Sequence, residues 1–134
     1  MFSAVSGHSA EIVRAVIDAY NQRDMDAMLA RFDPDVVWHT TPGFLWPGSY
    51  RGREAVRGLF AHWWQGWDTG YADAEELVEA DDRVMVSADV HGRSAGDGLD
   101  VHVELNWVFH VREGLIDLVQ SYPSADEARA ALRA

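Results

Sequence analysis

The sequence predicts an α+β fold, with helices in its first half and an antiparallel sheet in its second. Before Gly70, apolar side chains recur at helical spacing in three segments. After Gly70 the pattern changes to an alternation of apolar and polar side chains, which is typical of strands with one buried face. Short turns join these alternating segments, and helices segregated from turn-linked strands are typical of α+β domains.

Two helices are expected near the N-terminus. The first covers residues 10–22, where apolar side chains repeat every three or four positions, and Ser9 is expected to cap it. The second is capped by Asp24 and has an apolar repeat over residues 25–32. The Asp-Pro pair at 33–34 ends this helix, because proline cannot continue the hydrogen-bonding pattern.

A strand, a loop and a third helix follow. The run Val36–Thr41 alternates and is rich in β-branched residues, so it predicts a strand. Two Pro-Gly pairs, at 42–43 and 47–48, enclose an apolar loop that contains Trp46. The third helix starts near Arg53. It has the strongest periodic signal of the chain, an apolar stripe made of Val56, Leu59, Phe60, Trp63, Trp64 and Trp67.

Four more strands and a final helix complete the chain. The strands are predicted at 71–79, 83–92, 100–111 and 115–122, and residues 125–134 predict a short amphipathic helix. The strand 100–111 alternates most clearly. We expect one face to point inward, with Val101, Val103, Leu105, Trp107 and Phe109, and the other to point outward, with His102, Glu104, Asn106 and His110.

Length and charge restrict the class of protein. The 134 residues fit one domain, spanning 1–134, and are enough to build a core without disulfides, which the absence of cysteine excludes. The 22 acidic residues outnumber 11 basic ones, all Arg, and give a net charge of −11. A surface of this sign repels nucleic acid and anionic membranes, so neither is expected as a partner. With no recognisable signal peptide, a cytoplasmic location is expected.

Three segments carry a family resemblance. They are residues 19–42 (AYNQRDMDAMLARFDPDVVWHTTP), 50–60 (YRGREAVRGLF) and 108–119 (VFHVREGLIDLV). In this order and spacing, the chain resembles the SnoaL-like polyketide cyclase and ketosteroid isomerase branches of the nuclear transport factor 2-like superfamily. The resemblance implies a conical barrel, in which three N-terminal helices cover a strongly curved, mainly antiparallel sheet around a central pocket, usually in a homodimer.

The resemblance does not carry over the catalytic groups of ketosteroid isomerase. That enzyme uses a carboxylate base, and a Tyr and a protonated Asp as oxyanion donors. In this chain, Val16 stands at the position of the catalytic Tyr, Thr40 at the position of the base, and Phe60 at the position of an accessory Tyr. The second donor falls on Trp107, or on Asn106 if the alignment is counted back from the following turn without a gap. Steroid isomerisation by that set of residues is therefore excluded. The Asp-Arg-Asp arrangement of limonene epoxide hydrolase has no counterpart on a candidate strand either.

Weaker candidates for a polar site remain. Tyr20 lies on the apolar face of the first helix, and Thr40, at the position of the base, is the weakest hydrogen-bonding substitute for a carboxylate. His39 could serve as acid or base if the turn after it brings the imidazole to the pocket mouth. These three are the catalytic candidates. We expect the wall of a ligand pocket to be formed by Val16, Trp38, Phe60, Trp64, Leu105 and Trp107.

The outer sheet face is expected to serve self-association rather than metal binding. Asp89, His91, His102 and Glu104 resemble a set of mixed metal ligands, but alternation places them on the solvent side, so no metal and no cofactor are expected. A homodimer is predicted through a mixed patch on the same face, formed by His102, Glu104, Asn106 and Val108.

Two functions are compatible with this sequence. The first is a cofactor-independent enzyme that transfers protons on a small hydrophobic, oxygenated molecule, as an isomerase, cyclase or hydratase does. The second is a non-catalytic module that binds such a molecule in the same pocket. A carboxylate or imidazole with a shifted pKa inside the pocket would distinguish the enzyme from the binding module.

Overall fold

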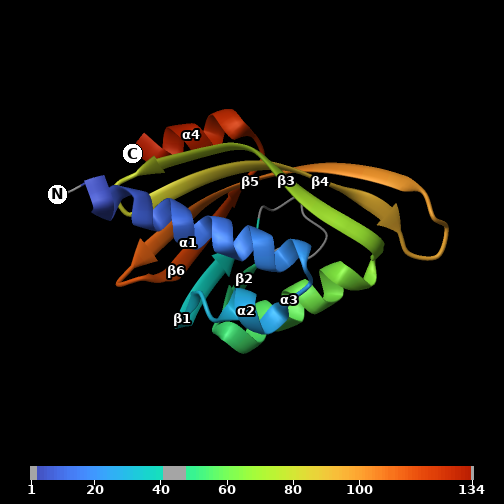
Figure 1. The fold of residues 1–134 in the computed structure, drawn as a ribbon. Helices are drawn as coiled ribbons and strands as arrows, with labels where there is room; N and C mark the ends of the chain where they lie inside the picture. The colour runs from blue at the N-terminus through green and yellow to red at the C-terminus, as the bar shows by residue number, and fades with distance from the viewer. Residues whose placement is uncertain (1–2, 41–47, 134) are drawn as a thin grey trace.

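The computed structural model describes residues 3–40 and 48–133 as helices and strands around one curved sheet (Figure 1). The elements in chain order are α1 (Ser3–Asn21), α2 (Met25–Leu29), β1 (Phe32–His39), β2 (Ser49–Arg51), α3 (Arg53–Gln65), β3 (Trp67–Ala80), β4 (Arg83–Ser94), β5 (Asp100–Arg112), β6 (Leu115–Tyr122) and α4 (Ala125–Arg133).

The six strands form a single sheet in the order β2-β1-β6-β5-β4-β3. All neighbouring strands are antiparallel except β1 and β6, which pair in parallel. Figure 1 shows the sheet strongly curved, with α1, α2 and α3 on its concave side and α4 on the other. The predicted α+β fold with three N-terminal helices on a curved, mainly antiparallel sheet is thus confirmed, although the sheet does not close into a barrel.

The helix boundaries differ from the predictions in three places. Helix α2 ends at Leu29, and the Asp-Pro pair at 33–34 lies inside β1, so it does not end the helix. Helix α1 begins at Ser3, so Ser9 lies inside the helix and does not cap it. A helix extends wherever nothing stops it, because each added residue gains one hydrogen bond. Helix α3 ends at Gln65, and Trp67 belongs to β3 instead of the helical stripe. Asp24 caps α2 as predicted, since its carboxylate accepts a hydrogen bond of 3.2 Å from the backbone N–H of Ala27.

The other boundaries lie close to the predicted ones. β1 starts at Phe32, four residues earlier than predicted, and the three-residue strand β2 was not predicted. The apolar loop expected between the Pro-Gly pairs lies largely in 41–47, outside the described residues. No helix in the described part of the chain is long and apolar enough to span a membrane.

Both faces of the sheet are covered over much of their area. On the concave face, Val84 and Val86 of β4 pack with Phe109 of β5 in the main core beneath the helices. On the convex face, α4 packs on Met85 and Val108, which are fully buried. An ion pair links this helix to β3. Nε of Arg129 lies 2.6 Å from Oε2 of Glu76, and Nη2 of Arg129 lies 3.1 Å from Oε1. This hydrogen-bonded Arg129 lowers the pKa of Glu76.

Candidate ligand-binding cavity

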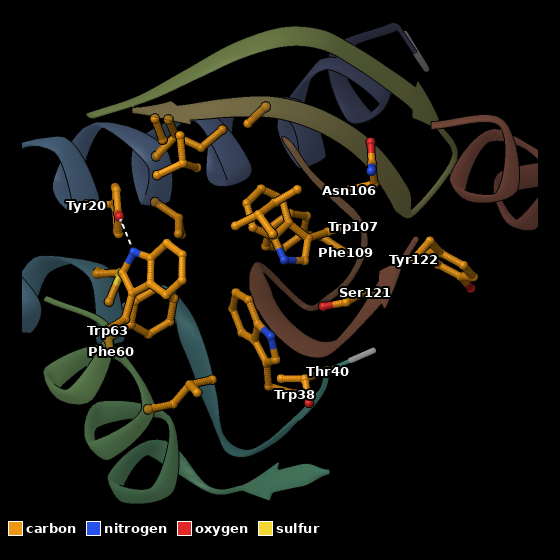
Figure 2. Close-up of a pocket in the computed structure, with 18 residues that line it drawn as sticks. Tyr20, Trp38, Thr40, Phe60, Trp63, Asn106, Trp107, Phe109, Ser121 and Tyr122 are labelled. Atoms are coloured by element: carbon orange, nitrogen blue, oxygen red, sulfur yellow. Dashed lines mark hydrogen bonds between the residues drawn. The ribbon is translucent and has the colours of Figure 1, made fainter. Parts of the chain in front are cut away.

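A cavity of about 90 Å³ lies between the three N-terminal helices and the concave face of the sheet. Figure 2 shows its wall as a group of aromatic rings with a few hydroxyl and amide groups at the margin. Its residues come from α1, α2, α3 and all of the long strands. Cavities that hold drug-sized ligands measure about 300–1,000 Å³, so this space fits a molecule of roughly one small ring.

Trp38 of β1 is the centre of the aromatic wall. It is only 5% exposed and meets four rings edge to face. The ring centroids lie 5.2 Å away for Phe60, 6.0 Å for Phe32 and Phe109, and 6.3 Å for Trp107. Alternation explains this position, because Trp38 and the buried Val36 leave β1 on the same side.

Tyr20 contributes a hydroxyl group at the helical side of the cavity. The phenol oxygen accepts a hydrogen bond of 2.6 Å from the indole N–H of Trp63 (Figure 2). Burial raises the pKa of the Tyr20 hydroxyl above its usual value, and the hydrogen bonds from Trp63 and Trp64 only partly oppose this shift. The hydroxyl is therefore protonated at neutral pH, and it is able to donate a hydrogen bond but not to act as a base.

The other two catalytic candidates occupy different places. Thr40 lines the cavity, and its hydroxyl donates a hydrogen bond of 3.1 Å to the backbone carbonyl of Gly48. His39 does not line the cavity, because its ring leaves β1 on the side opposite Trp38. Its Nδ1 lies 2.6 Å from the Oγ of Ser49 on β2. The structure thus brings Tyr20 and Thr40 to one cavity and separates His39 from both.

Five of the six residues expected in the pocket wall do line the cavity, namely Val16, Trp38, Phe60, Leu105 and Trp107. Trp64 does not, and Trp63 takes its place. On α3, Trp63 follows the lining residue Leu59 by four positions and shares its face, whereas Trp64 is turned by about 100° from Trp63. Trp64 packs on Tyr20 at 5.5 Å, and the guanidinium of Arg23 lies 6.0 Å from its ring centroid.

Several lining residues were missed by sequence reasoning. Among them are Met28, Ala72, Ser121 and Tyr122. Ser121 had a readable signal, because it lies two residues after the buried Val119 on β6 and therefore on the same face. No sequence signal distinguishes Met28, whose helical spacing fits ordinary core packing equally well.

Trp107 and Asn106, the two alternatives for the second donor, lie on opposite faces of β5. Trp107 pairs with Val86 and faces the concave side, as preferred from the sequence. Asn106 also borders the cavity, but its side chain leaves the strand on the opposite side and donates a hydrogen bond of 3.2 Å to Glu104. Within the described residues, the carbonyl oxygen of the Asn106 side chain is buried without a hydrogen-bond partner.

The expected self-association patch is smaller than the sequence suggested. Asn106 and Val108 are each only 1% exposed, so neither offers a surface to a second copy of the chain. The reason is α4, which packs over Val108. His102 and Glu104 remain exposed, and dimerisation through this face stays a prediction.

The histidines and carboxylates of the convex face interact in pairs. Nδ1 of His102 lies 3.1 Å from the nearer carboxylate oxygen of Asp89, and the ring of His91 stacks on His102 with centroids 5.4 Å apart. The described part of the chain contains no group of three or more His, Asp or Glu side chains placed to hold a metal ion.

The cavity wall carries no formal charge in the part of the chain that the structure describes. None of its described residues is Asp, Glu, His or Arg. Its polar groups are hydroxyls, the Asn106 amide and indole N–H groups. Such a wall can enclose an uncharged apolar molecule and donate hydrogen bonds to it, but it offers no strong base.

Comparison with known proteins agrees with this architecture. A crystal structure of an NTF2-like protein of unknown function from Burkholderia pseudomallei is similar with a TM-score of 0.78 and 19% identity, covering 95% of this chain and 98% of that one. A protein from Catenulispora acidiphila with a ketosteroid isomerase-like fold, solved in complex with trimethylamine, has a TM-score of 0.74 and 22% identity, covering 85% of each chain.

A proposed polyketide cyclase from Sinorhizobium meliloti has a TM-score of 0.68 and 25% identity, covering 84% of this chain and 94% of that one. No curated protein sequence matches the chain. The model of the SnoaL-like domain family matches residues 13–119, which include α2 and α3 and most of the sheet. The chain therefore belongs to the family of SnoaL-like domain proteins.

Proposed function

We propose that this SnoaL-like domain binds a small, uncharged, mainly apolar molecule with one oxygen function, such as a cyclic ketone, inside the aromatic cavity. The observation that carries the proposal is the composition of the wall. Trp38, Phe60, Trp63, Trp107 and Phe109 supply apolar ring surface, and none of the described lining residues carries a formal charge at neutral pH. Burying a charged ligand there without a partner would cost several kcal/mol, in the order of magnitude known for unpaired buried charges.

The names of structural relatives support the oxygenated character of the ligand. The family is that of SnoaL-like domains, and one structural relative is a proposed polyketide cyclase. Polyketides are molecules that carry oxygen functions on a carbon skeleton. The small cavity restricts the choice further, because about 90 Å³ is less than the roughly 150 Å³ of an engineered cavity that holds benzene. A five-membered cyclic ketone is therefore a suitable probe.

Cyclopentanone is expected to change the tryptophan fluorescence of the protein in a saturable way. The ligand displaces water from the faces of Trp38 and Trp107 and lowers the polarity around these rings. Replacing Trp107 by Ala should weaken binding by about 1–3 kcal/mol, since one large side chain leaves the wall. Titration calorimetry and fluorescence titration both measure this loss.

The matched control is Glu104→Ala, on the opposite face of the same strand. It should leave the affinity for cyclopentanone nearly unchanged, because Glu104 is exposed and does not line the cavity. Loss of binding in Glu104→Ala with retention in Trp107→Ala would contradict the proposed site and place the ligand on the convex face.

Cofactor-independent proton transfer on the same molecule is a second candidate function. It is favoured by the family and by the buried hydroxyl of Tyr20, which stays protonated and can polarise a carbonyl turned toward α1. The proton next to that carbonyl would pass to a water molecule, because no base lines the described wall. If the domain enolises its ligand, incubation of cyclopentanone in D₂O should replace the hydrogens next to the carbonyl by deuterium faster with protein than without it, as NMR measures.

Tyr20→Phe separates the two functions. In the enzyme, this variant should lose most of the exchange rate, by about 100-fold or more, while it retains binding. In the binding module, wild-type protein and variant should both exchange at the rate of buffer. The first outcome supports catalysis, and the second contradicts it.

A further inference from the structure

Two indole N–H groups and one hydroxyl on the cavity wall have no hydrogen-bond partner within the described residues. They belong to Trp38, Trp107 and Ser121, all of which line the cavity. The indole N–H of Trp63 differs, because it already donates to Tyr20. An indole nitrogen is a donor only, so neither Trp38 nor Trp107 can use its polar atom except by meeting an acceptor.

The register of three strands places these groups together. Trp107 of β5 pairs directly with Ser121 of β6, and β6 pairs in parallel with β1, where Trp38 lies opposite Val119. Since Val119 and Ser121 are two residues apart, their side chains leave β6 on the same face. The ring centroids of Trp38 and Trp107 are 6.3 Å apart, at an angle of 75°.

The close-up view agrees with this register. Figure 2 shows the nitrogen of Trp107 on the side of its ring that faces Trp38, and the oxygen of Ser121 at the end of a side chain that points toward the same space. The other polar side chains of the described wall are Tyr20, Thr40, Trp63, Asn106 and Tyr122, and the remaining surface is apolar. The corner therefore offers three adjacent donors to anything that enters the cavity.

We propose that Trp38, Trp107 and Ser121 form a donor corner that receives the carbonyl oxygen of the ligand, and that this corner selects ketones over hydrocarbons of the same shape. The inference rests on the proposed function, because it concerns the same cavity. A carbonyl oxygen has two lone pairs and accepts both N–H groups, whereas a C=CH₂ group accepts neither and leaves the two donors without a partner.

The chemistry of the corner favours ligands with an oxygen acceptor. An ammonium ion has no lone pair and would leave the indole N–H groups unused. A hydrocarbon of the same shape gives these donors no acceptor, so the site should prefer the ketone.

Cyclopentanone and methylenecyclopentane test the corner in the unaltered protein. The two molecules differ only in C=O against C=CH₂, so apolar burial is nearly equal. The ketone should bind about 10-fold more tightly, which corresponds to about 1.4 kcal/mol, or about 0.7 kcal/mol for each of two hydrogen bonds with hydration already included. Equal affinity for both molecules would overturn the donor corner but leave the proposed function standing. Failure of both molecules to bind would overturn the proposed function and the corner with it.

Indole signals in the ¹H–¹⁵N spectrum give a direct readout. The chain has six Trp residues, and the indole N–H signals of Trp38 and Trp107 are assigned by Trp38→Phe and Trp107→Phe. Cyclopentanone should shift these two signals downfield, and methylenecyclopentane should not. A ketone-specific shift at the Trp63 signal alone would overturn the assignment of the corner.

The same variants test selectivity. Each Trp→Phe change removes one N–H and keeps an aromatic ring, so the preference for the ketone should fall from about 10-fold to about 3-fold, and Ser121→Ala should reduce it less.

Trp67→Phe is the matched control, because Trp67 is buried outside the cavity wall. It should leave the preference unchanged. An unchanged preference in both Trp38→Phe and Trp107→Phe would overturn the proposal. If either variant fails to fold, the comparison of cyclopentanone with methylenecyclopentane in the unaltered protein still tests the proposal.

Discussion

Replacing Trp38 by Ala is expected to lower the free energy of unfolding by about 3–5 kcal/mol. Trp38 is 5% exposed and packs edge to face against four rings, so its removal opens a void at the junction of β1, α3 and β5. The neighbouring rings hold one another and cannot collapse fully into that void. Urea denaturation followed by circular dichroism measures the loss, with a slope that should stay close to that of the unaltered protein.

The neighbouring residue in the same strand is the control. His39→Ala removes a side chain on the other face of β1, together with its contact to Ser49, and should cost about 1 kcal/mol or less. If His39→Ala cost as much as Trp38→Ala, the facing of β1 described above would be wrong, and the cavity would lack its central ring.

Replacing Gly92 by Ala is expected to cost about 3 kcal/mol or more, because a methyl group there meets backbone atoms. A Cβ at this position would lie 1.9 Å from the carbonyl oxygen of Thr69 and 2.8 Å from the Cα of Gly70. Both atoms belong to β3, which pairs with β4 at this point, and backbone in a paired strand cannot move aside as a flexible side chain can. Thermal unfolding should show a large fall in midpoint.

Gly58→Ala supplies the opposite expectation. Gly58 lies inside α3, and a Cβ added there meets no atom within 4 Å. Alanine has the higher helix propensity and restricts the unfolded chain, so this variant should gain about 0.5–1 kcal/mol. A loss of stability in Gly58→Ala comparable with that in Gly92→Ala would show that the position of the methyl group is not the cause.

The elements of this fold could be predicted because their signals are local. Helical spacing located α3, and alternation located β5 with Trp107 on its inner face. Which element covers a given face of the sheet depends on residues far away in the chain. The sequence placed Val108 at an exposed surface, because nothing near it in the chain shows that α4 returns to cover β5. The burial of Val108 depends on a helix that begins well after the strand has ended.

The cavity was predictable to the extent that side-chain direction follows from the strand. Trp38, Leu105 and Trp107 were found by alternation, whereas the choice between Trp63 and Trp64 depends on how α3 is rotated against the sheet. That rotation is set by packing of the whole helix, and two adjacent tryptophans give no local basis to choose between them. The donor corner could not be predicted from the sequence, because the assembled structure decides which N–H groups find a hydrogen-bond partner.

The parallel pairing of β1 with β6 affects the order in which the protein folds. Strands β3 to β6 are joined by short turns and can form as a meander from contacts near in sequence, which is the fast kind of assembly. Helix α3 and four strands lie between β1 and β6 in the chain, so the pairing of β1 with β6 closes a long loop and carries the larger entropic cost. Because Trp38 belongs to β1, we expect the cavity to form only when β1 pairs with β6. A ligand that binds only the completed cavity would then stabilise the docked β1 by mass action.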